Sequence, residues 1–268
     1  METGMNKIAA KIRIGTLKSI HYADSGHPGG SLSIVGILVY LYFKEMNIKD
    51  WRDPNRDRFV LSKGHACPAL YAVLAEKGFI EKKELWNLRK TGALLQGHPE
   101  IGIPGIEVVS GSLGQGFSAA LGIALGAKRL NKSFRVYVIL GDGECNEGQV
   151  WEGAMFGAFH KLDNLVAIVD YNNLQSDSNC DNVTALSPLN EKWKAFGWHV
   201  LEINGHDFKE IENAFKVARR TKGKPTCIIA HTIKGKGVSF MENNPAWHGS
   251  RGLTEEELRQ ALKELGEE

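Results

Sequence analysis

A polar segment, Gly141-Asp142-Gly143, directly follows an apolar run of the kind that forms strands. A second apolar run ends at Asn172-Asn173-Leu174, which places Asp142 and Asn172 30 positions apart (172 − 142). Side chains that follow the carboxyl ends of parallel strands lie at the sheet edge where ligands bind. A carboxylate, an amide oxygen and a main-chain carbonyl are the donors that Mg²⁺ or Ca²⁺ prefers. The pattern therefore indicates a divalent-cation site with coordination positions left for phosphate oxygens and water.

The glycines around Asp142 add a separate signal. Gly141 and Gly143 let the backbone approach a ligand closely, and the helix expected from Gln149 offers free amides to an anion. The helix dipole contributes only about 0.3–1 kcal/mol, so a cation must neutralise most of the charge of a bound diphosphate. A G-D-G after a strand is by itself usually only a turn. The segment is neither a G-x-G-x-x-G fingerprint nor a Walker A loop.

Short apolar runs alternate with helical patterns along the whole chain. The runs predict strands at 58–61, 135–140, 165–170, 199–203 and 226–230. The helical patterns cover 7–23, 31–45, 66–77, 115–130, 148–160 and 207–220. Several strands are apolar on both faces, as in sheets covered by helices on two sides. The sequence thus predicts an α/β fold with a parallel sheet and helices on both faces.

Three helices carry further local signals. Asp207 and Glu210 have the spacing of a capping box, which predicts a helix that begins there. The end of the chain, 254–268, has the pattern of a polar amphipathic helix that packs weakly. The helix from Gln115 is rich in glycine and alanine, which indicates close approach either to its own sheet or to another subunit.

Composition excludes several classes of protein. The 268 residues are 43% hydrophobic and 24% charged with a net charge of +2, so nothing indicates a nucleic-acid or anionic-membrane partner. The four cysteines form no C-x-x-C pair, and the N-terminus has no signal-peptide pattern. The most apolar run, 34–43, is far shorter than the roughly 20 residues that span a bilayer. We expect a single-domain cytoplasmic protein with reduced thiols.

The spacing from G-D-G to N-N resembles the thiamine-diphosphate motif, and the segment 141–154 resembles transketolase. Four other motifs are similar to the same family and follow in the expected order: Ser25-Gly26-His27-Pro28-Gly29, Leu61-Ser62-Lys63-Gly64-His65-Ala66, Gly97-His98-Pro99-Glu100 and Gly111-Ser112-Leu113-Gly114-Gln115-Gly116. The resemblance covers nearly the whole chain. It implies the thiamine-diphosphate-binding fold, with residues 1–268 as its diphosphate-binding domain.

The resemblance also implies ligands for the cofactor and its metal. The metal ligands correspond to Asp142, Asn172 and the main chain of Leu174. The residues expected at thiamine diphosphate are His65, Gly111, Ser112, Leu113, Gly143, Glu147, Asn172 and His248.

Catalytic roles follow from the same resemblance. His27 and His98 are expected to face the substrate channel, and His248 to lie near the reacting carbon and shuttle protons. Glu147 and Glu152 correspond to a carboxylate network that links paired active sites. His21, His160, His199, His206 and His231 are expected to be structural. Lys234-Gly235-Lys236-Gly237 resembles a family loop near the active site, although by itself it indicates a solvated turn.

The chain departs from full-length transketolases in one respect. Its sequence contains no pyrimidine-binding domain and no C-terminal domain, which carry the glutamate that activates the thiazolium and basic residues for sugar phosphates. The resemblance therefore implies a partner chain, a transketolase C-terminal subunit, in an α₂β₂ assembly. It implies transfer of a two-carbon ketol unit from a ketose phosphate to an aldose phosphate, with thiamine diphosphate and Mg²⁺ or Ca²⁺, in the pentose phosphate pathway.

Three alternatives remain open at this point. The chain resembles, less closely, the same half of a 2-oxo acid dehydrogenase α subunit or of deoxyxylulose-phosphate synthase. A non-catalytic scaffold that binds cofactor without turnover is a second alternative, although Asp142, Asn172 and the three histidines His27, His65 and His98 argue against it. A generic nucleotide-binding α/β domain is the third and lacks both nucleotide fingerprints.

Overall fold

The computed structural model describes residues 2–175, 178–249 and 251–267. Five strands form one sheet with the order β1-β2-β3-β5-β4, and every neighbouring pair is parallel. The strands are β1 (Arg58–Leu61), β2 (Val136–Gly141), β3 (Leu165–Tyr171), β4 (His199–Asn204) and β5 (Thr226–His231). All five predicted strands are confirmed, with each end within one residue of the prediction.

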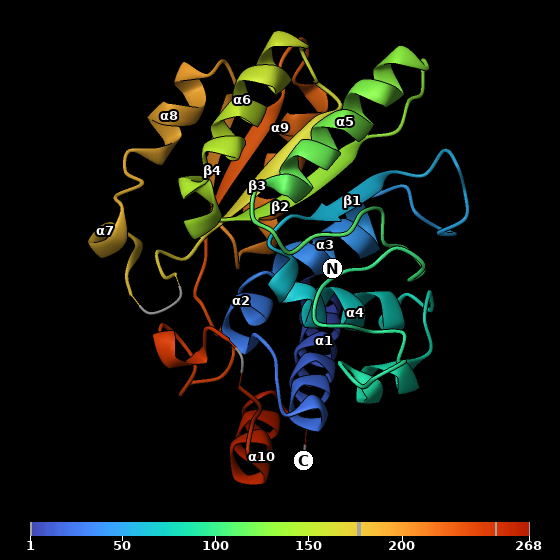
Figure 1. The fold of residues 1–268 in the computed structure, drawn as a ribbon, viewed down its shortest axis with the longest axis vertical. Coiled ribbons are helices and arrows are strands. Elements are labelled where there is room, and N and C mark those ends of the chain that lie inside the picture. Colours follow the sequence, from blue (N-terminus) through green and yellow to red (C-terminus); the bar gives the residue numbers. More distant parts are fainter. Residues whose placement is uncertain (1, 176–177, 250, 268) are drawn as a thin grey trace.

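Helices cover both faces of the sheet, as predicted (Figure 1). One face packs against α1 (Glu2–Ala23), α2 (Pro28–Ser33), α3 (Val35–Tyr40), α4 (Cys67–Glu76) and α9 (Phe208–Arg220). The other packs against α5 (Gln115–Arg129), α6 (Gly148–Phe159) and α8 (Leu189–Ala195). Successive strand residues alternate between the two cores: Tyr137 and Ile139 lie in the first, Val138 and Leu140 in the second. This period of two explains why the strands read as continuously apolar.

The position of α9 follows from the strand order. From β1 to β3 each new strand is added beside the one before it, and β4 continues in the same direction but leaves one position open between itself and β3. It then returns to place β5 between β3 and β4. Because parallel crossovers are right-handed, a step in the reverse direction places its helix on the opposite face. Figure 1 shows α5 and α6 side by side in front of the sheet and α9 behind it.

Several helices differ from the sequence prediction. The expected helix over 31–45 is divided into α2, α3 and a π-helical turn at Leu41–Glu45, all of it in the core up to Tyr42. The prediction missed α8 and the short α7 (Cys180–Val183). It also missed four 3₁₀ turns at Gly64–Ala66, Lys82–Asn87, Gly143–Asn146 and Pro245–Trp247. These segments are shorter than the window over which helical periodicity can be recognised.

The predicted helix-capping signals have mixed outcomes. The Asp207 side chain caps α9 by accepting from the amides of Lys209 and Glu210. The Glu210 carboxylate bonds to the amide of Asn204 instead of completing a capping box. A full capping box occurs at Thr254, where α10 (Glu255–Glu264) begins. This helix buries Leu258 and Ala261 beside α1, so its apolar side is anchored.

The glycines of α5 divide into two groups. A Cβ at Gly116 would lie 2.7 Å from the Cα of Ser62, so this glycine permits close packing on the chain's own fold. A Cβ at Gly122 or Gly126 would meet no atom of the described residues within 4 Å, so these two glycines face outward. Packing on the chain's own fold is thus confirmed at Gly116, whereas contact with another subunit at Gly122 and Gly126 stays a prediction.

A crevice is expected where neighbouring strands send their loops to opposite faces. The loop after β1 leads to α4 on one face, while the loop after β2 leads to α6 on the other.

In the described part of the chain, no helix combines the length and the apolar character needed to cross a membrane.

Candidate active site

A cavity of about 400 Å³ lies at the carboxyl edge of the sheet and is called the sheet-edge cavity. Loops that follow β1, β2, β3 and β5 all contribute to its wall. The residues singled out from the sequence that line it are His27, His65, Gly111, Leu113, Asp142, Gly143, Glu147, Asn172, Leu174 and His248. These residues are distant in the sequence, and the strand order brings them to one edge.

Three of the residues expected at the site lie outside this cavity wall. His98 is exposed and packs over Gly111, where a Cβ would lie 2.9 Å from the histidine ring. Ser112 is also exposed. Glu152 lines a separate groove between α5 and α6, whereas Glu147 lines the sheet-edge cavity. The two glutamates of the expected carboxylate network thus lie on different surfaces of this chain.

Asp142 joins the loops that follow β2 and β3. Its Oδ2 accepts from the amides of Asn172 at 2.9 Å and Asn173 at 2.5 Å, and its Oδ1 accepts from the amide of Gly143 at 2.8 Å. The side chain is buried. Burial and the nearby Asp170 raise the pKa of Asp142 to about 6. A cation beside this carboxylate would favour its ionised form.

The other two predicted metal donors are oriented by their neighbours. The Asn172 side-chain amide donates from Nδ2 to Asp170 at 3.0 Å, which leaves Oδ1 as the oxygen that faces away from Asp170. That oxygen accepts from the amide of Leu174 at 3.1 Å. The carbonyl of Leu174 accepts from the Lys234 ammonium at 2.7 Å and has a second lone pair.

This donor set fits a hard divalent cation. It comprises a carboxylate, an amide oxygen and a carbonyl oxygen, which are ligands of Mg²⁺ and Ca²⁺. The described residues contain no group of three or more histidine, cysteine or acidic side chains arranged to hold a metal, as expected where only one donor is a carboxylate. Gln175 and His27 each have a buried nitrogen without a hydrogen-bond partner among the described residues, and both line this cavity.

Asp170, at the end of β3, organises the floor of the cavity and was not identified from the sequence. It is fully buried and accepts from the Lys63 ammonium at 2.6 Å, Ser33 Oγ at 2.8 Å and Thr232 Oγ1 at 2.5 Å. Burial opposes its ionisation, but the Lys63 ammonium and these hydrogen bonds together lower the pKa of Asp170. The signal available in the sequence was an acidic residue that ends an otherwise apolar strand.

Lys234 lines the cavity, as the resemblance of its loop to a family loop near the active site implied. The prediction of a solvated turn is wrong for this lysine, because only 2% of it is exposed. Burial, and then repulsion from Lys63, lower the pKa of Lys234 to about 8. Lys63 and Lys234 both line the sheet-edge cavity, but the charge of Lys63 is compensated by Asp170, so Lys234 is the lysine of this pair that can balance an anionic ligand.

Three histidine rings form a triangle at the cavity. The ring centroids of His27 and His65 are 5.1 Å apart, those of His27 and His248 are 5.8 Å apart, and those of His65 and His248 are 5.5 Å apart. Burial and nearby cations lower the pKa of His27 to about 4 and that of His248 to about 3, and hold that of His65 well below its usual value. Neutral imidazoles at this position can accept or transfer a proton.

The tautomer of His248 follows from its neighbour. Lys234 Nζ lies 2.7 Å from His248 Nδ1. An ammonium can only donate, so Nδ1 accepts and the proton of the neutral ring resides on Nε2. Lys234 thereby fixes which nitrogen of His248 can donate a proton.

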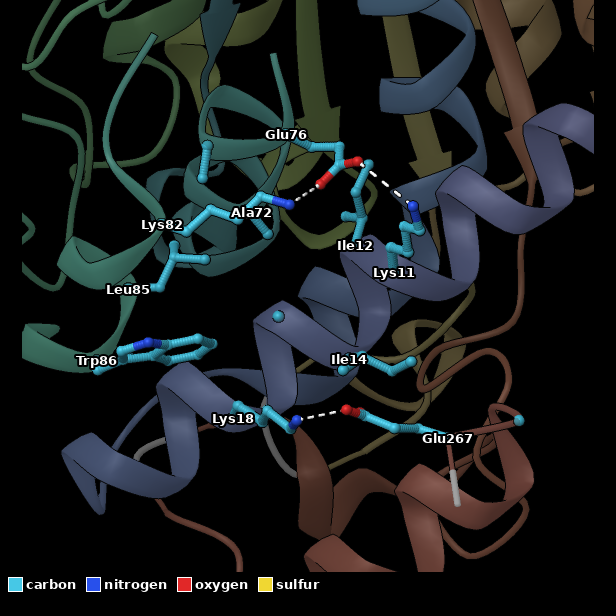
Figure 2. Close-up of a pocket in the computed structure, with 13 residues that line it drawn as sticks. Lys11, Ile12, Ile14, Lys18, Ala72, Glu76, Lys82, Leu85, Trp86 and Glu267 are labelled. Carbon is cyan, nitrogen blue, oxygen red and sulfur yellow. Dashed lines mark hydrogen bonds and ion pairs between the residues drawn. The ribbon is translucent and has the colours of Figure 1, made fainter. Parts of the chain in front are cut away.

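A second cavity, of about 420 Å³, lies between α1, α4 and the 3₁₀ turn Lys82–Asn87, and is called the α1 cavity (Figure 2). Its wall is mostly apolar and includes Ile12, Leu85 and Trp86. Lysines at its rim pair with carboxylates, with Lys82 at 2.7 Å from Glu76. It contains none of the residues predicted to take part in chemistry.

Comparison with known proteins identifies the family of the chain. The model of the family described as transketolase, thiamine diphosphate binding domain, matches residues 5–268. The chain is 47% identical over 260 residues to a protein named 6-deoxy-6-sulfo-D-fructose transketolase subunit SqwG, from Clostridium sp. (strain MSTE9), covering 96% of this chain and 94% of that one. It is 44% identical over 262 residues to a protein named as one subunit of an apulose-4-phosphate transketolase, from Phocaeicola vulgatus, covering 96% and 92% of the two chains.

Solved structures show the same fold. The transketolase of Campylobacter jejuni superposes with a TM-score of 0.91 at 33% identity, covering 98% of this chain and 42% of that one. The chain therefore corresponds to about two fifths of the solved transketolases that it matches, and to almost the whole of the two relatives named as subunits.

Proposed function

The chain belongs to the transketolase family, as its thiamine-diphosphate-binding part, and we propose that it works as the N-terminal subunit of a two-chain transketolase. In this proposal a two-carbon ketol unit passes from a ketose phosphate to an aldose phosphate, with thiamine diphosphate and Mg²⁺ at the sheet-edge cavity. The observation that carries the proposal is the convergence of Asp142, Asn172 and the Leu174 carbonyl beside two buried lysines.

The residues of the cavity have separable tasks. Asp142, Asn172 and the Leu174 carbonyl would hold the cation, and Gly143, which lines the cavity without a side chain, would let the diphosphate approach the backbone. Lys234 balances the remaining negative charge and keeps the proton of His248 on Nε2. Bound thiamine diphosphate supplies the nucleophilic carbon and the electron sink for carbon–carbon cleavage.

The histidines act on protons around the substrate. His248 Nε2 is a donor to the oxygen of a substrate carbonyl, and neutral His27 is an acceptor for a hydroxyl proton. His98 lies outside the cavity wall but packs over Gly111 at its border, so it is positioned to meet the outer part of a sugar chain. Residues 1–268 then act as one diphosphate-binding domain.

We infer that the second half of the site comes from a partner chain that carries the pyrimidine-binding and C-terminal domains. Two relatives of similar length are named as subunits, which supports a partner. Several large apolar side chains of α6 are exposed, among them Met155 and Phe159, at 53% and 80%. Such an exposed apolar surface is suited to contact with another chain, and we propose an α₂β₂ assembly in the cytoplasm.

The names of two relatives indicate a class of donor sugar. One relative is named for 6-deoxy-6-sulfo-D-fructose and another for apulose 4-phosphate. Both names describe ketoses with an anionic end. We therefore propose an anionic ketose as donor, with the pentose phosphate pathway as the first context to test.

The test combines the purified chain with the product of the neighbouring reading frame, thiamine diphosphate and Mg²⁺. The assay measures two-carbon transfer from xylulose 5-phosphate to ribose 5-phosphate, then from sulfonated and branched ketose donors, with each chain alone as the control. Activity only in the mixture supports a split transketolase. A stable complex that binds the cofactor but transfers no ketol unit from any donor would contradict the enzymatic proposal and favour a scaffold.

A further inference from the structure

Glu144 is a buried carboxylate that the function described above does not use. It lies in the 3₁₀ turn Gly143–Asn146, with only 2% of the residue exposed. Its Oε1 accepts from Ser62 Oγ at 2.5 Å and from the amide of Gly114 at 2.8 Å. Its Oε2 accepts from the amide of Gly141 at 3.0 Å. The carboxylate has three donors and forms no ion pair within 4.0 Å among the described residues.

The three donors belong to three segments that are far apart in the sequence. Ser62 begins the loop after β1, which leads to Lys63 and His65. Gly114 closes the segment Gly111-Ser112-Leu113 and precedes α5. Gly141 ends β2 directly before Asp142. Each segment supplies residues of the sheet-edge cavity, so one side chain connects three of its walls.

A second bond strengthens this connection. Ser62 Oγ donates to Glu144 and also accepts from the amide of Phe117, in the first turn of α5, at 2.9 Å. The start of α5 is therefore held to the loop after β1 through Glu144 and Ser62 together. Gly116, in the same turn, approaches Ser62 so closely that a side chain there would collide with it. The loop after β1 and the first turn of α5 are therefore in direct contact as well as joined by these bonds.

We propose that Glu144 is a positioning residue that holds these three loops in the arrangement needed to bind thiamine diphosphate, and that it does so without touching substrate. The inference rests on the proposed function for the identity of the ligand. A carboxylate that served only the stability of the fold could take its donors from any segments of the chain. The donors of Glu144 all lie in segments that line one cavity. Loops fixed before binding lose less conformational freedom when the ligand arrives, which raises affinity.

The test uses Glu144→Gln, which keeps the shape of the side chain. It replaces one accepting oxygen by an amide NH₂ group, which can only donate and so cannot bond to the protein donors around it. The dissociation constant of thiamine diphosphate with Mg²⁺ should rise about 10- to 100-fold, the range expected for hydrogen bonds to a charged group. The turnover number at saturating cofactor should stay within about threefold, because binding and not chemistry is affected. Both quantities are measured on the complex with the partner subunit.

Three further variants separate positioning from stability. Ser62→Ala should weaken cofactor binding less, and the double variant should bind no more weakly than Glu144→Gln alone, because the two side chains act as a unit. Glu107→Gln serves as the control, since Glu107 is a largely covered carboxylate paired with Arg56 and Arg58 away from the cavity. It should lower the midpoint of thermal unfolding without changing cofactor affinity.

Amide hydrogen exchange gives a readout that needs no cofactor. The amides of Gly114 and Gly141 should exchange faster in Glu144→Gln than in the unaltered chain, while those of β4 keep their rates. Unchanged exchange and unchanged affinity would overturn the proposal, and so would a loss of turnover with unchanged affinity. If the complex of the unaltered chain with its partner binds no thiamine diphosphate, the proposed function fails, but the exchange rates still decide whether Glu144 holds the loops.

Discussion

The sheet-edge cavity and the α1 cavity are almost equal in size, at about 400 and 420 Å³, but differ in the placement of their charges. In the α1 cavity the charged groups are at the rim, and the side chain of Lys82 is 65% exposed. In the sheet-edge cavity Lys63, Asp142 and Asp170 are each at least 97% buried. Charged groups are costly to bury unless a partner compensates them. Burial of charge, and not volume, therefore distinguishes the binding site from a surface hollow.

The two regions also differ in how many parts of the chain they need. The α1 cavity is formed by helices that pack for their own stability, with apolar side chains such as Ile12 and Leu85 in its wall (Figure 2). The sheet-edge cavity depends on hydrogen bonds between loops, such as that from the amide of Asn172 to Asp142. Substitutions in the sheet-edge cavity should consequently change ligand binding, whereas substitutions in the α1 cavity should change only local packing.

The largest difference should come from Asp142→Ala. This change removes a predicted metal ligand and also the acceptor that joins two loops. The affinity for thiamine diphosphate with Mg²⁺ should therefore fall by more than about 100-fold. This exceeds the loss typical for residues that only hydrogen-bond to a metal ligand. Calorimetric titration of the complex measures it. Asp142→Asn keeps the shape of the side chain and serves as the control for misfolding. It should also lose affinity for the cofactor, because it removes the charge of the carboxylate.

Glu76→Gln is the matched change at the α1 cavity. Glu76 pairs with Lys82 at 2.7 Å and lies within 4.0 Å of Lys11. Such exposed pairs contribute about 0–1 kcal/mol to stability. Cofactor affinity should not change. Equal losses of affinity in Asp142→Ala and Glu76→Gln would show that the two cavities do not differ as described.

A smaller effect is expected from Lys234→Met. The ammonium donates to Leu174 and lies against His248, and its removal should weaken cofactor binding about 10- to 100-fold, as for other hydrogen bonds to charged groups. Because a buried charge is replaced by an apolar group of similar length, the free energy of unfolding should stay the same or rise. Chemical denaturation and calorimetry measure the two quantities.

Lys82→Met provides the control lysine, because Lys82 is largely exposed beside the α1 cavity. It should change neither cofactor affinity nor, by more than about 0.5 kcal/mol, the free energy of unfolding. If Lys234→Met instead lowered stability and left cofactor affinity intact, its ammonium would serve the fold and not the ligand.

Much of this arrangement could be predicted from the sequence. The strands were predictable because buried parallel strands are short apolar runs, and Asp142 and Asn172 because each follows such a run directly. The course of the chain through α2 and α3 was not, since a helix buried on all sides has no amphipathic period that would reveal the interruption at Ile34.

The rest of the site depends on contacts between distant segments. Glu144 bonds to Ser62 and Gly114, which are 82 and 30 positions away, and Asp170 bonds to Lys63 over 107 positions. No local pattern marks such partners. Lys234 shows the same limit of local patterns, because a lysine between a strand and a glycine has the appearance of a surface turn, and only the family resemblance of its loop indicated a position near the site.

The last prediction concerns pH. Burial lowers the pKa of His27 and of His206 to about 4 and that of His248 to about 3, below the value of 6.5 for a free histidine. The unfolded chain binds more protons than the folded chain between these values, so stability rises with pH in this window and falls as the pH is lowered from about 6.5 to 4. Each such histidine adds at most about 1.4 kcal/mol per pH unit.

Urea unfolding of the chain at pH 7.5, 6.0 and 5.0 measures this dependence. His248→Asn removes one titrating group from the sheet-edge cavity and should make the loss of stability between pH 6.0 and 5.0 shallower. His206→Asn should have the same effect. The ring of His206 lies outside the sheet-edge cavity, but it is largely buried, and burial is what lowers its pKa. Trp86→Phe in the α1 cavity introduces and removes no titrating group, so its slope should equal that of the unaltered chain. A slope unchanged by His248→Asn would mean that this ring is as accessible to protons in the folded chain as in the unfolded one, and the contrast between the two cavities would then not extend to their histidines.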